Sequence, residues 1–113
     1  MKQKHFMDIS RIKEGDSALC VSNTGGFQAG DQIVIQEKVD GANASIRYEV
    51  ETGTLIAFSR KQELSYHKTL NGLWNYVQLL EAKAYERYKN YIFFGEWLLK
   101  NAIKYKPEAY SHW

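Results

Sequence analysis

A single lysine, Lys38, lies between two acidic residues, Glu37 and Asp40, and close to Gly41. A neutral lysine amine is a good nucleophile, but the free ammonium has a pKa near ~10.4, so the lysine becomes catalytic only where its site favours the uncharged form. The neighbouring carboxylates favour the ammonium. A divalent cation, or a triphosphate complexed with one, would have to reverse the local field before Lys38 could attack. Taken alone, the pattern equally fits a charged strand end beside a turn glycine.

Two acidic residues occupy positions where apolar side chains are expected. Glu37 shares one face of a predicted strand with Ile33, Ile35 and Val39, and Glu96 lies within the apolar run 91–99. An ionised carboxylate in such a setting costs several kcal/mol unless it is paired, hydrogen-bonded or met by a ligand. Both positions are therefore candidates for a binding site. For Glu96 the alternative is a structural salt bridge to Arg60 or to a nearby lysine.

The elements that must position these residues are strands. Residues 32–39 are predicted as a first strand that ends at Gly41, and residues 43–50 alternate with Ala44, Ile46, Tyr48 and Val50 on one face. Residues 51–53 form a turn, and residues 54–60 return as the second arm of a hairpin. This hairpin is expected to bring Arg60 back toward the end that carries Lys38 and Asn43.

A helix and another strand complete an α+β outline. From residue 70 to residue 89 the apolar positions follow a 3.6-residue period, which predicts one helix packed across the sheet; they are Leu73, Val77, Leu80, Ala84 and Tyr88. Residues 91–94, which are aromatic or β-branched, predict a strand with two apolar faces. The predicted fold class is therefore α+β, with antiparallel sheets and packed helices.

Composition indicates one folded domain. The chain is 44% apolar and 25% charged and has one proline, which is typical of globular proteins. No apolar run is long enough to span a membrane, and no secretory signal follows Met1. Cys20 is the only cysteine, which excludes an internal disulfide and fits a reducing compartment. We therefore expect a cytoplasmic protein without a membrane partner.

Positive charge is concentrated in the second half of the chain. Residues 1–59 contain six Lys or Arg against eight Asp or Glu, whereas residues 60–113 contain nine against five. Lys100, Lys104 and Lys106 alternate with tyrosines and could follow a phosphate backbone, although the spacing favours a solvated helix face. The three histidines have no partner at metal-ligand spacing, so the sequence predicts no protein-held metal site.

Three ordered motifs carry a resemblance to a known family. Lys38-Val39-Asp40-Gly41 resembles the Lys-x-Asp-Gly nucleophile motif of the covalent nucleotidyltransferases, which include polynucleotide ligases and mRNA capping enzymes. Glu37 before the motif and Ala42-Asn43 after it are similar to the nick-sealing, ATP-dependent RNA ligases. Phe58-Ser59-Arg60 and Phe94-Gly95-Glu96-Trp97 resemble two later motifs of the family. The resemblance covers residues 31–98.

The resemblance implies a fold and a reaction. The fold would be an ATP-grasp-like nucleotidyltransferase domain, and the cofactors would be ATP with Mg²⁺ or Mn²⁺. The Lys38 amine would attack the α-phosphate, release pyrophosphate and hold AMP as a phosphoramidate. The AMP would then pass to an RNA 5′-phosphate, and a 3′-hydroxyl would displace it. The nucleotide-binding residues implied by the motifs are Glu37 on the adenine side, Asp40 and Gly41 beside the lysine, Asn43 at the phosphate, and Arg60 and Glu96 at the ribose and phosphate.

The motifs that follow these three in the family do not occur between Met1 and Trp113. They would supply an adenine-stacking aromatic residue, a metal-binding acid and a Lys-x-Lys pair. We therefore expect residues 1–113 to be the N-terminal portion of the domain, to label itself poorly with AMP, and to form a homodimer through exposed apolar surface. A DNA ligase, a capping-type guanylyltransferase, or a fragment that only binds nucleotide or RNA stay open as alternatives.

Overall fold

The computed structural model describes residues 3–7, 29–99 and 103–113. The chain divides into two compact units. One unit, here called the sheet unit, comprises Met1–His5 and Val39–Trp113; the other, here called the lysine unit, comprises Phe6–Lys38. Cys20 and Lys100, which entered the sequence predictions, lie outside the described residues.

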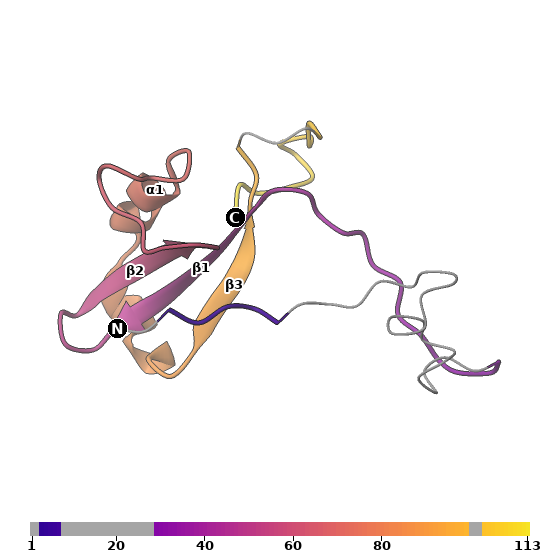
Figure 1. Ribbon diagram of the computed structural model, residues 1–113, viewed down its shortest axis with the longest axis horizontal. Helices are drawn as coiled ribbons and strands as arrows, with labels where there is room; N and C mark the ends of the chain where they lie inside the picture. The colour runs from indigo at the N-terminus through magenta and orange to yellow at the C-terminus, as the bar shows by residue number, and fades with distance from the viewer. Residues whose placement is uncertain (1–2, 8–28, 100–102) are drawn as a thin grey trace. The chain divides into compact units, whose positions relative to one another are not determined.

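The sheet unit is built on three antiparallel strands. Strand β1 (Ala42–Glu49) lies in the centre, with β2 (Thr54–Ser59) on one side and β3 (Ile92–Trp97) on the other (Figure 1). The predicted hairpin is confirmed. Its turn places Gly53 at φ 66°, and the Gly53 N–H donates to the Glu49 carbonyl at 2.9 Å. A positive φ is readily adopted by glycine, which is why the chain reverses here.

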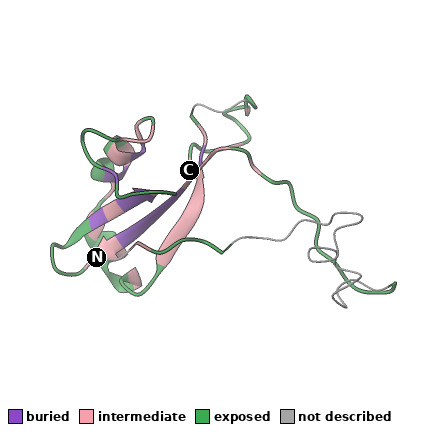
Figure 2. Cartoon of the chain, in the orientation of Figure 1, coloured by how far each residue is buried: buried purple, intermediate pink, exposed green. Residues whose placement is uncertain are grey.

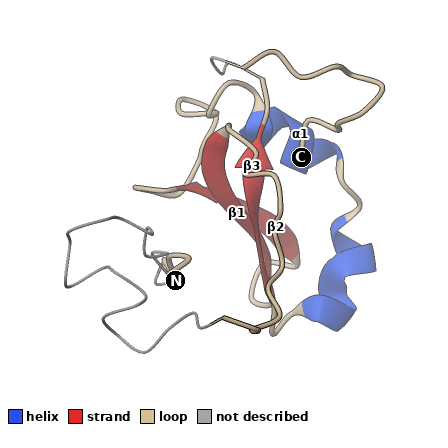
Figure 3. Ribbon diagram, turned by 90° about the vertical axis from the view of Figure 1, so that its right-hand side faces the viewer, coloured by secondary structure: helices blue, strands red, loops and turns tan. Residues whose placement is uncertain are grey.

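Two short helices cover one face of this sheet. Helix α1 spans Leu73–Leu79 and the 3₁₀ helix η1 spans Ala82–Tyr88; Figure 3 shows both on the same side of the strands. The fold class is therefore α+β, as predicted. The single helix predicted over residues 70–89 is wrong, because Leu80 (ψ 142°) and Glu81 (ψ 99°) are extended.

The break in the helix has a simple geometric reason. A continuous 20-residue helix would be about 30 Å long, whereas a six-residue strand spans about 20 Å. The break keeps both helices over the sheet. It also lets Tyr85 and Tyr88 of η1 meet Phe93 of β3 edge to face, with ring centroids 6.1 and 5.8 Å apart.

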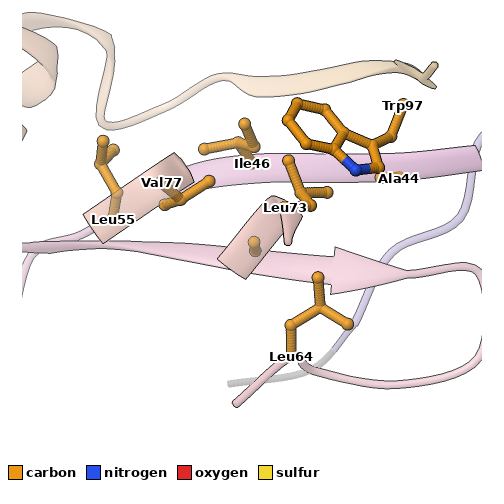
Figure 4. Packing of buried hydrophobic residues seen from close by; sticks show 8 residues of the cluster. Ala44, Ile46, Leu55, Leu64, Leu73, Val77 and Trp97 are labelled. Atoms are coloured by element: carbon orange, nitrogen blue, oxygen red, sulfur yellow. The ribbon is translucent and has the colours of Figure 1, made fainter. Parts of the chain in front are cut away.

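The core lies between the helices and the sheet. Figure 4 shows the side chains that fill it, and Figure 2 shows that burial is concentrated in β1 and β2; the buried members are Ala44, Ile46, Leu55, Ala57, Leu64, Leu73, Val77 and Trp97. Val50, predicted to extend the apolar face of β1, is 61% exposed because β1 ends at Glu49. The opposite face of β1 is buried as well, at Ser45 and Arg47. The Arg47 guanidinium lies 4.7 Å from the centroid of the Phe58 ring.

The strand predicted over residues 32–39 is wrong. Residues 31–38 are exposed, and no strand is assigned to them. Their alternating apolar side chains indicate β-propensity, but a strand also requires a neighbour that accepts and donates its backbone hydrogen bonds. Among the described residues, no helix is both long and apolar enough to cross a membrane.

Candidate active site

Asn43 and Glu96 come together at one end of the sheet. Asn43 is the second residue of β1 and pairs with Glu96 of β3 in the antiparallel register. The Asn43 amide Nδ2 donates to Glu96 Oε1 over 3.5 Å, which is a long hydrogen bond. Both side chains are half-buried. The two motif residues are therefore neighbours because the strand register places them side by side.

Gly41 allows the chain to enter β1 close to the end of β3. A Cβ atom at this position would lie 2.7 Å from the Trp97 carbonyl oxygen and 2.7 Å from Leu98 Cδ2. Real Cβ atoms do not approach a backbone oxygen this closely. The glycine of the lysine motif thus has a structural reason, which is the close approach of two backbone segments.

Asp40 is held through its backbone by an aromatic residue from the C-terminal part of the chain. The Asp40 N–H donates to the Tyr105 hydroxyl at 2.6 Å, and the Tyr105 ring lies 4.7 Å from the Tyr110 ring, centroid to centroid. The Asp40 residue itself is exposed. Its carboxylate is therefore accessible at the end of the sheet that carries Asn43 and Glu96.

Arg60 lies in a tight turn directly after β2. Ser59 pairs with Ala44, so Arg60 follows at the end of the sheet that carries Asn43. The Ser59 hydroxyl oxygen accepts from the backbone N–H groups of Lys61 (3.3 Å) and Gln62 (3.2 Å), which fixes the turn. The hairpin thus brings Arg60 back toward Asn43, as predicted.

Glu37 and Lys38 are the last residues of the lysine unit, and both are exposed. Lys38 is joined by one peptide bond to Val39, which belongs to the sheet unit. Val39 also lines a pocket together with Glu96. The covalent link therefore attaches the candidate nucleophile directly to a residue of that pocket.

A pocket of about 390 Å³ opens at the edge of β3. Its lining combines one carboxylate with aromatic and aliphatic side chains, and consists of Val39, Glu96, Leu98, Ala109, Tyr110, Ser111 and Trp113. The Leu98 N–H donates to the His112 carbonyl at 2.9 Å, which holds the C-terminal segment beside the strand end. The volume falls within the range of ligand-binding pockets, and a single carboxylate lies among apolar walls.

Gly95 gives the C-terminal tryptophan its place in that pocket. A Cβ atom at Gly95 would lie 2.9 Å from Trp113 Cη2, so the indole packs against the bare backbone of β3. Next to it, the Trp97 and His112 rings meet edge to face at 5.9 Å. The glycine of the Gly-Glu motif therefore makes room for an aromatic pocket wall.

The sequence prediction missed Tyr110 and Trp113 as pocket residues. Residues 103–113 form turns and irregular structure, so their apolar residues follow neither a helical nor a strand period. The solvated helix face considered from the spacing of Lys100 and Lys104 is not found at Lys104, since Lys104 and Lys106 are exposed in this irregular segment; Lys100 lies outside the described residues. The available signal was Gly95, a residue without a side chain inside an otherwise bulky strand.

The donor set of the site bears on metal binding. Across residues 3–7, 29–99 and 103–113, no group of three or more His, Cys, Asp or Glu side chains could hold a metal ion. Mg²⁺ in nucleotide sites is commonly bound by one or two carboxylates together with the substrate phosphates.

Comparison with known proteins identifies the family. A family model described as RNA ligase matches residues 31–113, which is 83 of the 113 residues. Comparison with curated proteins and with solved structures found no match. The matched range includes the lysine motif, the arginine after β2, the Gly-Glu pair and the aromatic residues of the pocket. The chain belongs to the RNA ligase family.

Proposed function

We propose that this protein is an ATP-dependent RNA ligase that forms a covalent lysyl-AMP and joins 5′-phosphate to 3′-hydroxyl ends. Membership of the RNA ligase family supports the ligase activity and the RNA substrate. One structural observation carries the nucleotide chemistry. Val39 of the lysine motif and Glu96 of the Gly-Glu motif, far apart in the sequence, line the same pocket.

The pocket is suited to an adenosine moiety. Tyr110 and Trp113 offer aromatic faces on which a purine can stack, and Glu96 offers carboxylate oxygens that can accept from ribose hydroxyls. Leu98 and Val39 supply apolar walls. We infer that the adenosine occupies this pocket, with its phosphates directed toward Asp40 and Arg60.

The Lys38 amine would then perform the first step. It attacks the α-phosphorus of ATP, a P–N bond forms, and the bond to the pyrophosphate oxygen breaks. The exposed Lys38 is joined by its peptide bond to Val39, a residue of the pocket wall, so the nucleophile and the pocket are adjacent along the chain. In such displacements, positioning and charge neutralisation do most of the work.

Magnesium is part of this proposal. The triphosphate would provide most of its ligands, and the exposed Asp40, two residues after the nucleophile, would offer a carboxylate. The ion would neutralise phosphate charge and offset the effect of Glu37 and Asp40 on the lysine amine. Arg60 would add a fixed positive charge on the same end of the sheet.

The proposal is tested by detecting the covalent lysyl-AMP intermediate. Residues 1–113 are fused to a segment that supplies the family's later acidic residue and Lys-x-Lys pair, and the fusion is incubated with ATP and Mg²⁺. Intact-mass spectrometry should detect one added AMP, and both Lys38→Ala and Lys38→Arg should abolish it. Arginine keeps the charge but offers no free amine.

Three controls make this result specific. Lys61→Arg, an equally exposed lysine outside the motif, should label like the parent. GTP in place of ATP should not label, which separates a ligase from a capping-type enzyme, and sealing of nicked RNA but not nicked DNA excludes a DNA ligase. Labelling that survives Lys38→Ala would remove Lys38 from its role.

A further inference from the structure

An exposed aromatic cluster lies between β2 and α1. Tyr66 is 72% exposed, and its ring meets His67 at 5.4 Å and Trp74 at 6.1 Å, both edge to face. Lys61 and Lys68 are exposed in the same segment. We call the set Lys61, Tyr66, His67, Lys68 and Trp74 the Tyr66 surface. A large aromatic side chain that is mostly exposed to water indicates a function beyond packing.

Two linked turns hold this surface in place. Ser65 and Lys68 exchange backbone hydrogen bonds at 3.1 and 3.0 Å, which closes a tight turn with Tyr66 and His67 at its tip. Lys68 Nζ donates to Gln62 Oε1 at 3.4 Å. Gln62 belongs to the turn that carries Arg60. The Tyr66 surface is therefore tied to the turn next to the candidate active site.

A left-handed run of backbone follows directly. Leu70 (φ 50°), Asn71 (φ 52°) and Gly72 (φ 90°) are consecutive, and a left-handed leucine costs on the order of 1–3 kcal/mol. The run is anchored because the Trp97 indole Nε1 donates to the Asn71 carbonyl at 3.1 Å. It leads into α1, whose second residue, Trp74, stands beside the Tyr66 ring. The chain thus maintains backbone strain in the connection that leads to this aromatic pair.

The charge of residues 59–69 indicates which class of partner the Tyr66 surface binds. Residues 59–69 contain three cations, Arg60, Lys61 and Lys68, against one carboxylate, Glu63. Aromatic faces interleaved with cations are the combination that binds single-stranded nucleic acid, where bases stack and phosphates are neutralised. An acidic or purely apolar protein partner would use only one of these two features.

We propose that the Tyr66 surface binds single-stranded RNA, with a base stacked on the exposed Tyr66 ring and backbone phosphates beside Lys61 and Lys68. The inference rests on the proposed function, since it names a place where the RNA substrate is held. The stacked base belongs to a strand that continues toward Arg60, because Lys68 and Gln62 join the two turns.

The protein offers a matched control. Tyr91 is 64% exposed, also lies beside another aromatic ring (Tyr88, 6.2 Å), and has the basic neighbours Arg87 and Lys89. Tyr91 differs from Tyr66 in its position in the fold. Tyr91 precedes Ile92, which pairs with Arg47 in the second half of β1, so it lies at the end of the sheet opposite Asn43. A general attraction of RNA to tyrosines and cations would involve both positions equally.

The experiment measures RNA affinity of the 113-residue chain by fluorescence anisotropy, with labelled oligouridylate as the probe. Uracil stacks weakly on its neighbours and does not compete for an adenosine pocket. Tyr66→Ala should raise Kd about five- to tenfold, and Tyr66→Leu should do the same while keeping the apolar contact with Trp74. Tyr66→Phe and Tyr91→Ala should leave Kd unchanged.

A salt titration tests the cations. For single strands each phosphate contact contributes about 0.7 to the slope of log K against log salt concentration. The double substitution Lys61→Ala with Lys68→Ala should therefore reduce that slope by about 1.4. Lys83→Ala with Lys89→Ala, two exposed lysines at η1, should leave it unchanged.

Several outcomes would overturn the proposal: no binding of oligouridylate, an equal loss with Tyr91→Ala, or equal competition by duplex RNA of the same length, whose paired bases offer no free faces. Thermal melting checks that each variant is folded. Failure of the proposed function looks different. It would appear as absent AMP transfer to Lys38 in the fusion with Tyr66-dependent RNA binding intact, whereas failure of this inference leaves AMP transfer intact and RNA affinity insensitive to Tyr66.

Discussion

At the scale of single residues, the site depends on one carboxylate with two tasks. Glu96 accepts a hydrogen bond from Asn43 and also lines the aromatic pocket. A carboxylate has two oxygens and about four lone-pair sites, so it can serve Asn43 and a ligand hydroxyl at the same time. The long distance to Asn43, 3.5 Å, indicates a weak structural bond. We therefore expect ligand binding to depend on this charge more than folding does.

Glu96→Gln tests this expectation. Glutamine keeps the shape and an oxygen that can accept from Asn43, but it removes the charge. Nucleotide affinity and AMP transfer should fall about 10- to 100-fold, the value of a hydrogen bond to a charged group, while the melting temperature hardly changes. Glu108→Gln, at an exposed position in the irregular C-terminal segment, is the control. A large loss of melting temperature with normal AMP transfer would instead give Glu96 a structural role.

The two motif glycines should respond differently to the same substitution. At Gly41 the new Cβ meets a backbone oxygen at 2.7 Å, so Gly41→Ala should lower the free energy of unfolding by about 1–3 kcal/mol. At Gly95 the nearest atoms that it would meet belong to the Trp113 ring, the first at 2.9 Å, and a side chain shifts more readily than backbone. Gly95→Ala should therefore cost less stability and mainly weaken ATP binding. Urea titration and calorimetric ATP binding distinguish the two, and equal losses of stability would contradict this account.

At the scale of elements, α1 contributes the largest fully buried side chains among the described residues. Leu73 is 0% exposed and Val77 is 2% exposed, although the helix has only seven residues and no side-chain cap. A helix this short is marginal by itself. Its stability therefore comes from burial against the sheet, and the sheet in turn depends on α1 to cover its core face.

Leu73→Ala should destabilise the protein by about 2–5 kcal/mol, because it leaves a cavity in the core. Leu79 offers a control in the same helix with the same residue type, since it is 85% exposed; Leu79→Ala should change stability by no more than about 0.5 kcal/mol. Chemical denaturation followed by circular dichroism measures both. Similar losses for the two leucines would show that α1 does not seal the core as described.

Local patterns predicted the elements whose stability is local. The hairpin was predictable because alternation and Gly53 act over a few residues, and β3 because its apolar run is continuous. The helix was predicted too long because Leu80 and Ala84 keep the helical period across the break. The strand over residues 32–39 has the right propensity but no assigned pairing, which no local pattern reveals. Tyr110 and Trp113 reach the site through irregular backbone, so only the three-dimensional arrangement identifies them.

At the scale of the whole molecule, the lysine motif crosses the boundary between two units. Lys38 ends one unit and Val39 begins the main part of the other, and the RNA ligase match, residues 31–113, spans both. The expected homodimer stays a prediction. It is supported by the apolar side chains of Ile33, Val34 and Ile35, which are 57%, 85% and 87% exposed. Sedimentation at increasing concentration measures that association.

Residues 31–38 are exposed and form no strand, so adenylylation of Lys38 can be followed with a protease. Residues 31–38 are accessible to trypsin, which requires a positively charged side chain before the bond it cuts, so the Lys38–Val39 bond should be among the first cleaved. A lysine that carries AMP is no longer a cation. Adenylylation of the fusion should therefore protect this one bond and leave cleavage after Lys61 unchanged, and pyrophosphate, by reversing the reaction, should restore the cut. A digestion pattern that does not change when ATP or pyrophosphate is added would contradict a covalent modification at Lys38. Cleavage of the Lys38–Val39 bond, which joins the two units, would thus show whether Lys38 carries AMP.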